Sequence, residues 1–169
     1  MLNFTRLILL LTLTTFFYSC KKSDTSNNTV PNSFKINADE YTLANAFYAL
    51  DSANEFTYLV LTSPSLSYNP SIFDFSGTGN FIAFDISDIT ATLRAGNYYN
   101  PIGFYSSIAL NYSTSIPPTT IEYEINDALP GTLNITKSNS TYTIKYEYTL
   151  TTGQLVKGQF VGPVQKVRL

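Results

Sequence analysis

The sequence predicts an all-β domain, either a single antiparallel β-sandwich or a flattened up-and-down β-barrel of about nine strands. From Phe34 onward, apolar residues recur at every second position and are rich in Tyr, Phe, Ile, Val and Thr, the pattern of strands with one packed face. Short segments of turn-forming residues separate these runs. No amphipathic helix has the length that a parallel crossover needs, so consecutive strands are expected to pair as antiparallel hairpins.

The individual strands follow from these runs in chain order. The clearest covers residues 142–150, where aromatic and aliphatic side chains at even positions share one face and Thr, Lys and Glu at odd positions share the other. Segment 44–50 contains Ala and Leu and could form helical turns, but a strand is favoured there. The expected strands are 34–37, 41–50, 56–62, 80–86, 108–114, 120–126, 132–136, 142–150 and 155–161.

Two of these segments, 56–61 and 81–86, are apolar at successive positions rather than alternate ones. Such runs are typical of central strands that are covered on both faces. Between strands, Ser76-Gly77-Thr78-Gly79 is expected to be a hairpin turn, because a phosphate-binding loop would need a following helix. Alternation assigns a group of large aromatic residues to inner faces, namely Tyr41, Tyr58, Phe84, Tyr112, Tyr123, Tyr142, Tyr146 and Phe160.

Residues 1–19 have the features of a bacterial signal peptide. Arg6 gives a basic start, an apolar run covers residues 7–18, and a small residue precedes Cys20. The run is shorter than the roughly 20 apolar residues of a membrane-spanning helix. We therefore expect these residues to be removed rather than to span a membrane.

Phe17-Tyr18-Ser19-Cys20 resembles the lipobox of bacterial lipoprotein precursors. The resemblance implies cleavage before Cys20, diacylglycerol on its sulfur, and a membrane as lasting partner, since stable anchoring takes more than one acyl chain. The Ser-Cys-Lys-Lys start is similar to that of Bacteroidota lipoproteins, which implies a lipid-anchored outer-membrane protein, periplasmic or surface-facing. Residues 20–32 are then the lipidated cysteine and a flexible polar tether, and residues 33–169 the all-β domain.

The C-terminal part carries a second resemblance. Gly131-Thr132-Leu133-Asn134-Ile135 and the glycines Gly153, Gly158 and Gly162 are similar to the closing hairpins of small Bacteroidota lipoproteins of unassigned function. The resemblance implies an all-β fold and an envelope location, and it implies no activity.

The composition removes several kinds of chemistry. Histidine is absent and Cys20 is the only cysteine, so the usual general base, the Ser-His and Cys-His nucleophile pairs and the commonest zinc ligands are missing. A formal net charge of −2 offers no basic surface for nucleic acid. We expect a protein that is not an enzyme and that uses no catalytic residue, metal or cofactor.

Carboxylates are the remaining candidates for chemistry. Glu122 and Glu124 lie on the same face of an expected strand and could form an acid and base pair, although a solvated strand face is favoured. Asp74, Asp85 and Asp88 could supply oxygens to calcium but match no known calcium loop. Turn and strand-end positions are favoured for these three residues.

Exposed aromatic side chains are the most suggestive candidates for binding. Tyr98, Tyr99 and Tyr105 are expected in an irregular outer loop, where tyrosines could stack on carbohydrate or anchor a protein partner, while capping of the core is the alternative. Asp51-Ser52-Ala53 resembles the O-glycosylation signal of exported Bacteroidota proteins, which implies a glycan on Ser52.

These observations favour a binding module or an envelope structural part. The alternative is a lipocalin-like carrier of a small apolar ligand. The large aromatic residues assigned to the interior leave little room for such a ligand.

Lipidation of Cys20 gives the first prediction. Metabolic labelling with a palmitate analogue should mark the wild-type chain and leave Cys20→Ala unmarked, because the variant lacks the sulfur that accepts the lipid. Equal labelling of both chains would show that the anchor is not at this residue.

Overall fold

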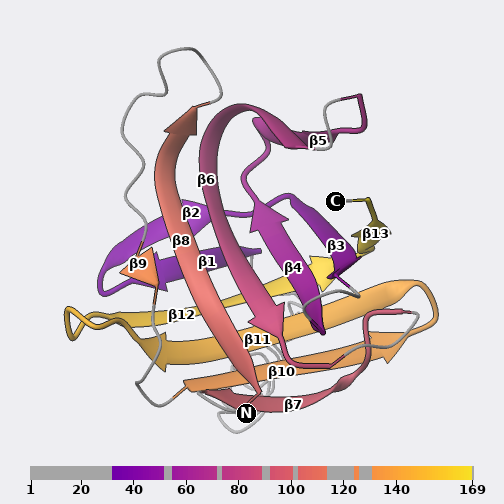
Figure 1. The fold of residues 1–169 in the computed structure, drawn as a ribbon. Coiled ribbons are helices and arrows are strands. Elements are labelled where there is room, and N and C mark those ends of the chain that lie inside the picture. The colour runs from indigo at the N-terminus through magenta and orange to yellow at the C-terminus, as the bar shows by residue number, and fades with distance from the viewer. Residues whose placement is uncertain are drawn as a thin grey trace, which may run out of the picture. The chain divides into compact units, whose positions relative to one another are not determined.

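The structure is a computed structural model, and it describes residues 32–51, 55–71, 74–88, 92–100, 103–113, 124–125 and 131–168. Residues Pro31–Leu169 form one compact unit. The regular elements of its described part are all strands, in two sheets (Figure 1). The predicted all-β class is confirmed.

The first sheet has six strands in the order β2-β1-β12-β11-β10-β7, and every neighbouring pair is antiparallel. Its centre is the pair of hairpins formed by β10, β11 and β12, which agrees with the alternation that predicts them. The strands are β1 Ser33–Ile36, β2 Asp39–Thr42, β7 Gly96–Asn100, β10 Gly131–Ser138, β11 Thr141–Thr149 and β12 Leu155–Gly162.

The second sheet has the order β13-β3-β4-β6-β8-β9, and β5 pairs with the first part of β6. Only the short pairing of β13 with β3 is parallel. The strands are β3 Asn45–Asp51, β4 Phe56–Thr62, β5 Leu66–Asn69, β6 Asp74–Ile86, β8 Phe104–Ser113, β9 Glu124–Ile125 and β13 Gln165–Lys166.

The two sheets pack face to face and their strands cross, with β4, β6 and β8 nearest the viewer in Figure 1. One hydrophobic core joins side chains of both sheets. The Phe84 ring of β6 lies 5.0 Å from the Tyr146 ring of β11, and Phe104 of β8 lies 6.4 Å from Tyr148. Because the sheets keep separate strand orders in the described residues, the arrangement is a sandwich, and the flattened barrel is wrong.

The number of strands is larger than predicted, with thirteen in the described residues. The expected strand 41–50 is two strands in different sheets, because the chain leaves β2 of the first sheet and enters β3 of the second. The glycine segment 76–79 is not a turn but part of β6, in which Ser76 and Gly77 pair with β5 and Thr78 and Gly79 pair with β8. A Cβ on Gly77 would lie 2.0 Å from the carbonyl oxygen of Ser65, so the close approach of β5 requires a glycine there.

Several predictions about single segments are confirmed. Residues 45–51 form a strand and not a helix. Segments 56–61 and 81–86 belong to β4 and β6, which are interior strands of the second sheet as predicted. Coverage of both faces is wrong, because alternate residues such as Val60 and Ala83 are only partly buried. Of the strand expected over 120–126, only residues 124–125 lie within the described residues.

Alternation assigns most inward aromatic residues correctly, since Phe84, Tyr142, Tyr146 and Phe160 belong to the core and Tyr41 packs against it. The assignment of Tyr58 to the inner face is wrong, because its neighbours Thr57 and Leu59 are the residues that β4 buries there. The assignment of Tyr112 is also wrong, since its ring lies 5.4 Å from the Phe81 ring on the outer face of the sheet. Tyr123 lies outside the described residues.

The reversal at Tyr112 has a visible cause. The register between β6 and β8 shifts between Gly79 and Phe81, which is the signature of a β-bulge. Asn111 adopts a left-handed φ of 54° there, and its backbone N–H donates to Asn80 Oδ1 at 2.9 Å. The extra residue in β8 moves every later side chain to the other face.

The interior contains an unpaired polar group on β11. The Tyr146 hydroxyl is buried and has no hydrogen-bond partner among the described residues. Burial raises the pKa of Tyr146 well above its usual value, and the nearby Tyr148 adds to this. The ring therefore stabilises the core, while its hydroxyl costs free energy.

Two substitutions separate these contributions. Tyr146→Ala should lower the free energy of unfolding by about 3 kcal/mol or more as a large core deletion, whereas Tyr146→Phe should leave it equal or higher. Lys145→Ala, on the exposed face of the same strand, should stay within about 0.5 kcal/mol. Urea denaturation measures the free energy of unfolding of each variant. A Tyr146→Phe variant as unstable as Tyr146→Ala would show that the hydroxyl is hydrogen-bonded.

Candidate functional site

Several residues singled out from the sequence lie outside the described residues. These are Cys20, Ser52 and Glu122, together with the signal peptide and most of the tether. The backbone of Glu124 belongs to β9, but its side chain lies outside the described part. Lipidation, O-glycosylation and the paired glutamates therefore stay predictions.

The structure separates the three tyrosines expected in one outer loop. Tyr98 and Tyr99 lie in β7 of the first sheet, and Tyr105 lies in β8 of the second. Tyr98 packs against the core and its hydroxyl donates to the Arg94 carbonyl oxygen at 3.1 Å, while Tyr99 is 61% exposed. The prediction of an irregular outer loop is wrong for these tyrosines, because all three belong to strands.

The three aspartates considered for calcium also lie apart. Asp74 begins β6 and accepts a hydrogen bond from the Phe75 N–H at 2.7 Å. Asp88 follows that strand and forms an ion pair with Arg94 at 3.5 Å. Asp85 lies within β6. The described part of the chain contains no group of three or more acidic, cysteine or histidine side chains that could hold a metal ion.

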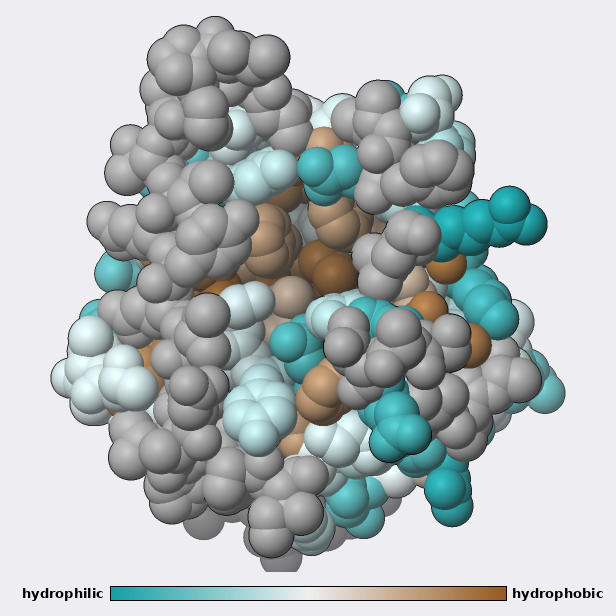
Figure 2. Space-filling view, in the orientation of Figure 1, coloured by the Kyte–Doolittle hydropathy of each residue, from teal (hydrophilic) through white to brown (hydrophobic). Residues whose placement is uncertain are grey.

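Aromatic side chains cover the outer face of the second sheet, the face directed away from the core. Rings contact one another in a chain, with centroids 5.5 Å apart for Phe47 and Phe75, 6.4 Å for Phe75 and Phe81, and 5.4 Å for Phe81 and Tyr112. Figure 2 looks onto this face and shows hydrophobic side chains gathered at its centre with hydrophilic ones toward the edges. Most of these rings are only partly buried, so the face remains accessible.

Within this face, three residues form a row across neighbouring strands. Tyr58 of β4 pairs with Asp85 of β6, and Asp85 pairs with Tyr105 of β8. Residues opposite each other in adjacent strands point to the same side. All three alternate with buried core residues along their strands, so their side chains project outward. We call this set the Tyr58–Asp85–Tyr105 row.

Two further side chains adjoin the row. Phe56 contacts Tyr105 edge to face, with ring centroids 6.4 Å apart. Asp51 of β3 lies opposite Phe56, and its negative charge helps to raise the pKa of the Tyr58 hydroxyl. The row therefore consists of a carboxylate between two phenol rings, with a third ring and a second carboxylate beside it.

Partial burial perturbs the ionisable groups of the row. It raises the pKa of Asp85 above the usual aspartate value, because the charged form loses hydration. Burial also raises the pKa of Tyr58, and the negative charges of Asp85 and then Asp51 add to that effect. Asp85 is thus held on an aromatic surface that disfavours its charge, and such groups are frequent at functional sites.

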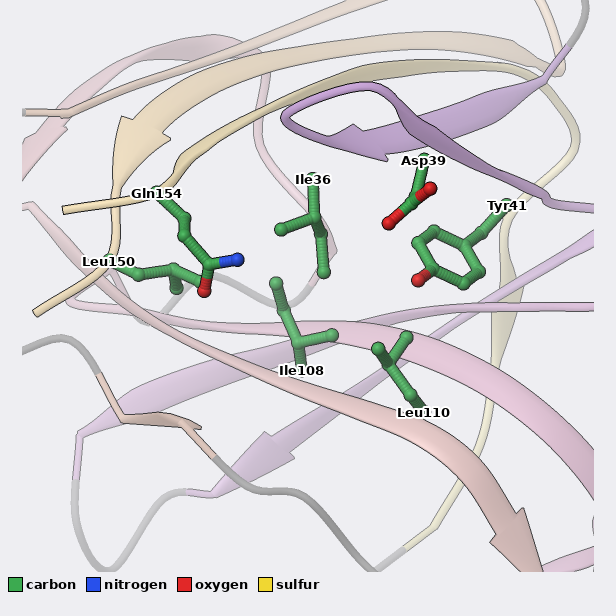
Figure 3. A pocket seen from close by; sticks show the side chains of 7 residues that line it. All are labelled: Ile36, Asp39, Tyr41, Ile108, Leu110, Leu150 and Gln154. Atoms are coloured by element: carbon green, nitrogen blue, oxygen red, sulfur yellow. The ribbon is translucent and has the colours of Figure 1, made fainter. Parts of the chain in front are cut away.

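A small cavity lies between strands β1 and β2 of the first sheet and β8 of the second (Figure 3). Its volume is about 190 Å³. In Figure 3, Ile36 and Ile108 point toward each other across it, and the Asp39 and Tyr41 side chains reach in from β2. The remaining lining residues are Leu110, Leu150 and Gln154.

The described part of the chain is thus a two-sheet β-sandwich with a polar and aromatic outer face, and it contains no helix that could cross a membrane. No known protein family, curated protein or solved structure matches this chain.

The sequence pattern singles out two members of the row but places them at other sites. It groups Tyr105 with Tyr98 and Asp85 with Asp88, and it assigns Tyr58 to the core. One signal in the sequence points to this site, namely the aspartate within the run Phe81-Ile82-Ala83-Phe84-Asp85-Ile86. A charged residue on a strand that is otherwise apolar on both faces breaks the local pattern, and such breaks are expected at functional sites.

The raised pKa of Asp85 predicts a stability effect with a defined sign. A carboxyl whose pKa is higher in the folded than in the unfolded chain binds its proton more tightly when folded, so ionisation at neutral pH lowers the free energy of unfolding. Asp85→Asn should therefore raise the melting temperature of the detergent-solubilised full chain at neutral pH. The gain should shrink as the pH falls through the folded pKa and vanish below the ordinary aspartate value.

Glu147→Gln is the matched control, since Glu147 is exposed on β11 and its substitution removes the same charge. Its melting temperature should follow the wild type across the same pH range. A destabilised Asp85→Asn variant at neutral pH would contradict the assignment of Asp85 to a dehydrated position.

Proposed function

We propose that this chain is a lipid-anchored, extracytoplasmic binding module that is not an enzyme and that binds carbohydrate through the outer face of its second sheet. The observation that carries the proposal is the Tyr58–Asp85–Tyr105 row. The proposed anchor at Cys20 and the polar tether of residues 21–32 hold this domain at the outer membrane.

Carbohydrate fits the chemistry of the row. Phenol rings offer flat apolar surfaces on which the C–H faces of sugar rings stack, while a carboxylate accepts hydrogen bonds from sugar hydroxyls. Tyr58 and Tyr105 are carried by interior strands, so a stacking ligand meets rings whose positions are fixed by the core. Binding therefore costs little ordering of the protein.

A protein partner fits less well. The buried centre of a protein interface is depleted in charged residues, and Asp85 stands at the centre of the row. Burying it under an apolar partner surface would add to a dehydration cost that its raised pKa already indicates. A sugar ligand keeps the carboxylate hydrogen-bonded.

The carrier alternative fits less well again. Pockets for small apolar ligands usually measure about 300 to 1,000 Å³, whereas the cavity between the sheets measures about 190 Å³. The core between the sheets is filled by large buried side chains, including Phe84, Phe104 and Tyr148.

A glycan array tests the proposed function. The detergent-solubilised full chain should bind a subset of glycans, and Tyr105→Ala should weaken that binding about tenfold or more through loss of a stacking surface. Tyr99→Ala is the control, because it removes an exposed tyrosine from β7 of the other sheet. Equal losses for both variants, or a loss for Tyr99→Ala alone, would move the binding site away from the row.

A further inference from the structure

We propose that the ligand of the Tyr58–Asp85–Tyr105 row is an amino sugar, whose protonated amino group binds the Asp85 carboxylate between the two phenol rings. This inference rests on the proposed function and specifies its ligand class. It follows from the charges, from the arrangement of the aromatic residues and from the position of the carboxylate in the sheet.

The charges on this face are not balanced by the strands that carry it. Asp85 and Asp51 both lie beside Tyr58. Strands β3, β4, β6 and β8 contain no lysine or arginine. The basic residue of the sheet's other described edge, Lys166 of β13, is separated from β6 by β3 and β4. Of the other described basic residues, Arg94 is paired with Asp88, and Arg168 follows β13 beside Tyr68. Burial is the cause of the raised pKa of Asp85, with no described cation acting against it. We therefore infer that a cation on Asp85 comes from the ligand.

The arrangement of the aromatic residues suits a cation at that position. Tyr58 and Tyr105 lie on either side of the strand that carries Asp85, so their backbones are about 10 Å apart. A group bound to Asp85 therefore has an aromatic side chain on each side, and aromatic faces attract a cation over roughly 6 Å. An ammonium group bound there would interact with the carboxylate and with both aromatic side chains.

A saccharide explains the rest of the surface better than a simple ammonium ion. The rings of Phe56 and Tyr105 touch each other beyond the row. On its other side, Tyr58 borders a hollow of about 70 Å³ that Val60, Tyr68 and Phe75 also line. These surfaces extend along the outer face past the reach of a single ammonium group. They can accept the neighbouring sugar rings of an oligosaccharide.

The free energy cost of an ionised Asp85 also favours a cationic ligand. Partial burial raises the pKa of this carboxyl, so the free protein carries a charge that its surroundings disfavour. A bound ammonium group would favour the ionised form and relieve that cost. A neutral sugar would offer hydrogen bonds but no such compensation.

Three tetrasaccharides with the same β-linked pyranose backbone separate these cases. They consist of glucosamine, N-acetylglucosamine or glucose, so that only the first carries free amino groups. Calorimetric titration of the detergent-solubilised full chain at slightly acidic pH, where the amines are protonated, should give an affinity for the glucosamine oligomer about fivefold or more above the other two. Asp85→Asn should abolish this preference, and Asp85→Glu should retain part of it.

The control for unspecific attraction of a polycation is Glu147→Gln, which removes the same charge from the other sheet and should leave the preference unchanged. Equal affinity for all three oligomers, lost in Tyr105→Ala, would overturn the amino-sugar inference and leave carbohydrate binding by the row intact. A glucosamine preference that survives in Asp85→Asn would also overturn the inference. Absence of binding to all three would overturn it too, and the glycan array then decides separately on carbohydrate binding.

Discussion

The packing of Phe84 between the two sheets is the interaction on which the rest of the domain depends. Its ring contacts Phe104 within its own sheet at 5.9 Å and Tyr146 and Tyr148 of the facing sheet at 5.0 and 6.3 Å. Because successive residues of a strand point to opposite faces, the burial of Phe84 directs Asp85 outward. The same contact that joins the sheets thus places the carboxylate of the proposed site.

The two faces of the second sheet serve different purposes with similar residues. The inner face is closed by the core, whereas the outer face exposes aromatic rings of the same kind together with a carboxyl group whose pKa is raised by partial burial. A neutral residue at position 85 would avoid the cost of dehydrating a charge. Under the proposed function, the core of the sandwich offsets that cost and the ligand uses the charge.

Periodicity in the sequence was sufficient for the class of fold, for the hairpins of residues 131–162 and for most of the inward aromatic residues. It was not sufficient where apolar residues occupy both faces of a strand, so the direction of Tyr58 depended on which face met the other sheet. Nor does alternation reveal the bulge at Asn111 or the change of sheet between β2 and β3. The candidate site joins three strands that are separated in sequence, and only their register brings Tyr58, Asp85 and Tyr105 together.

The short parallel pairing of β13 with β3 covers one edge of the second sheet. Gln165 and Lys166 lie against Phe47 and Tyr48, and the Val167 N–H donates to the Tyr48 carbonyl oxygen at 2.8 Å. This occupies backbone groups of β3 that could otherwise accept a strand from a neighbouring molecule. If the proposed lipid anchor holds many copies on one membrane, they meet at high local concentration. A C-terminal segment that covers a sheet edge would then limit lateral aggregation while leaving the outer face free.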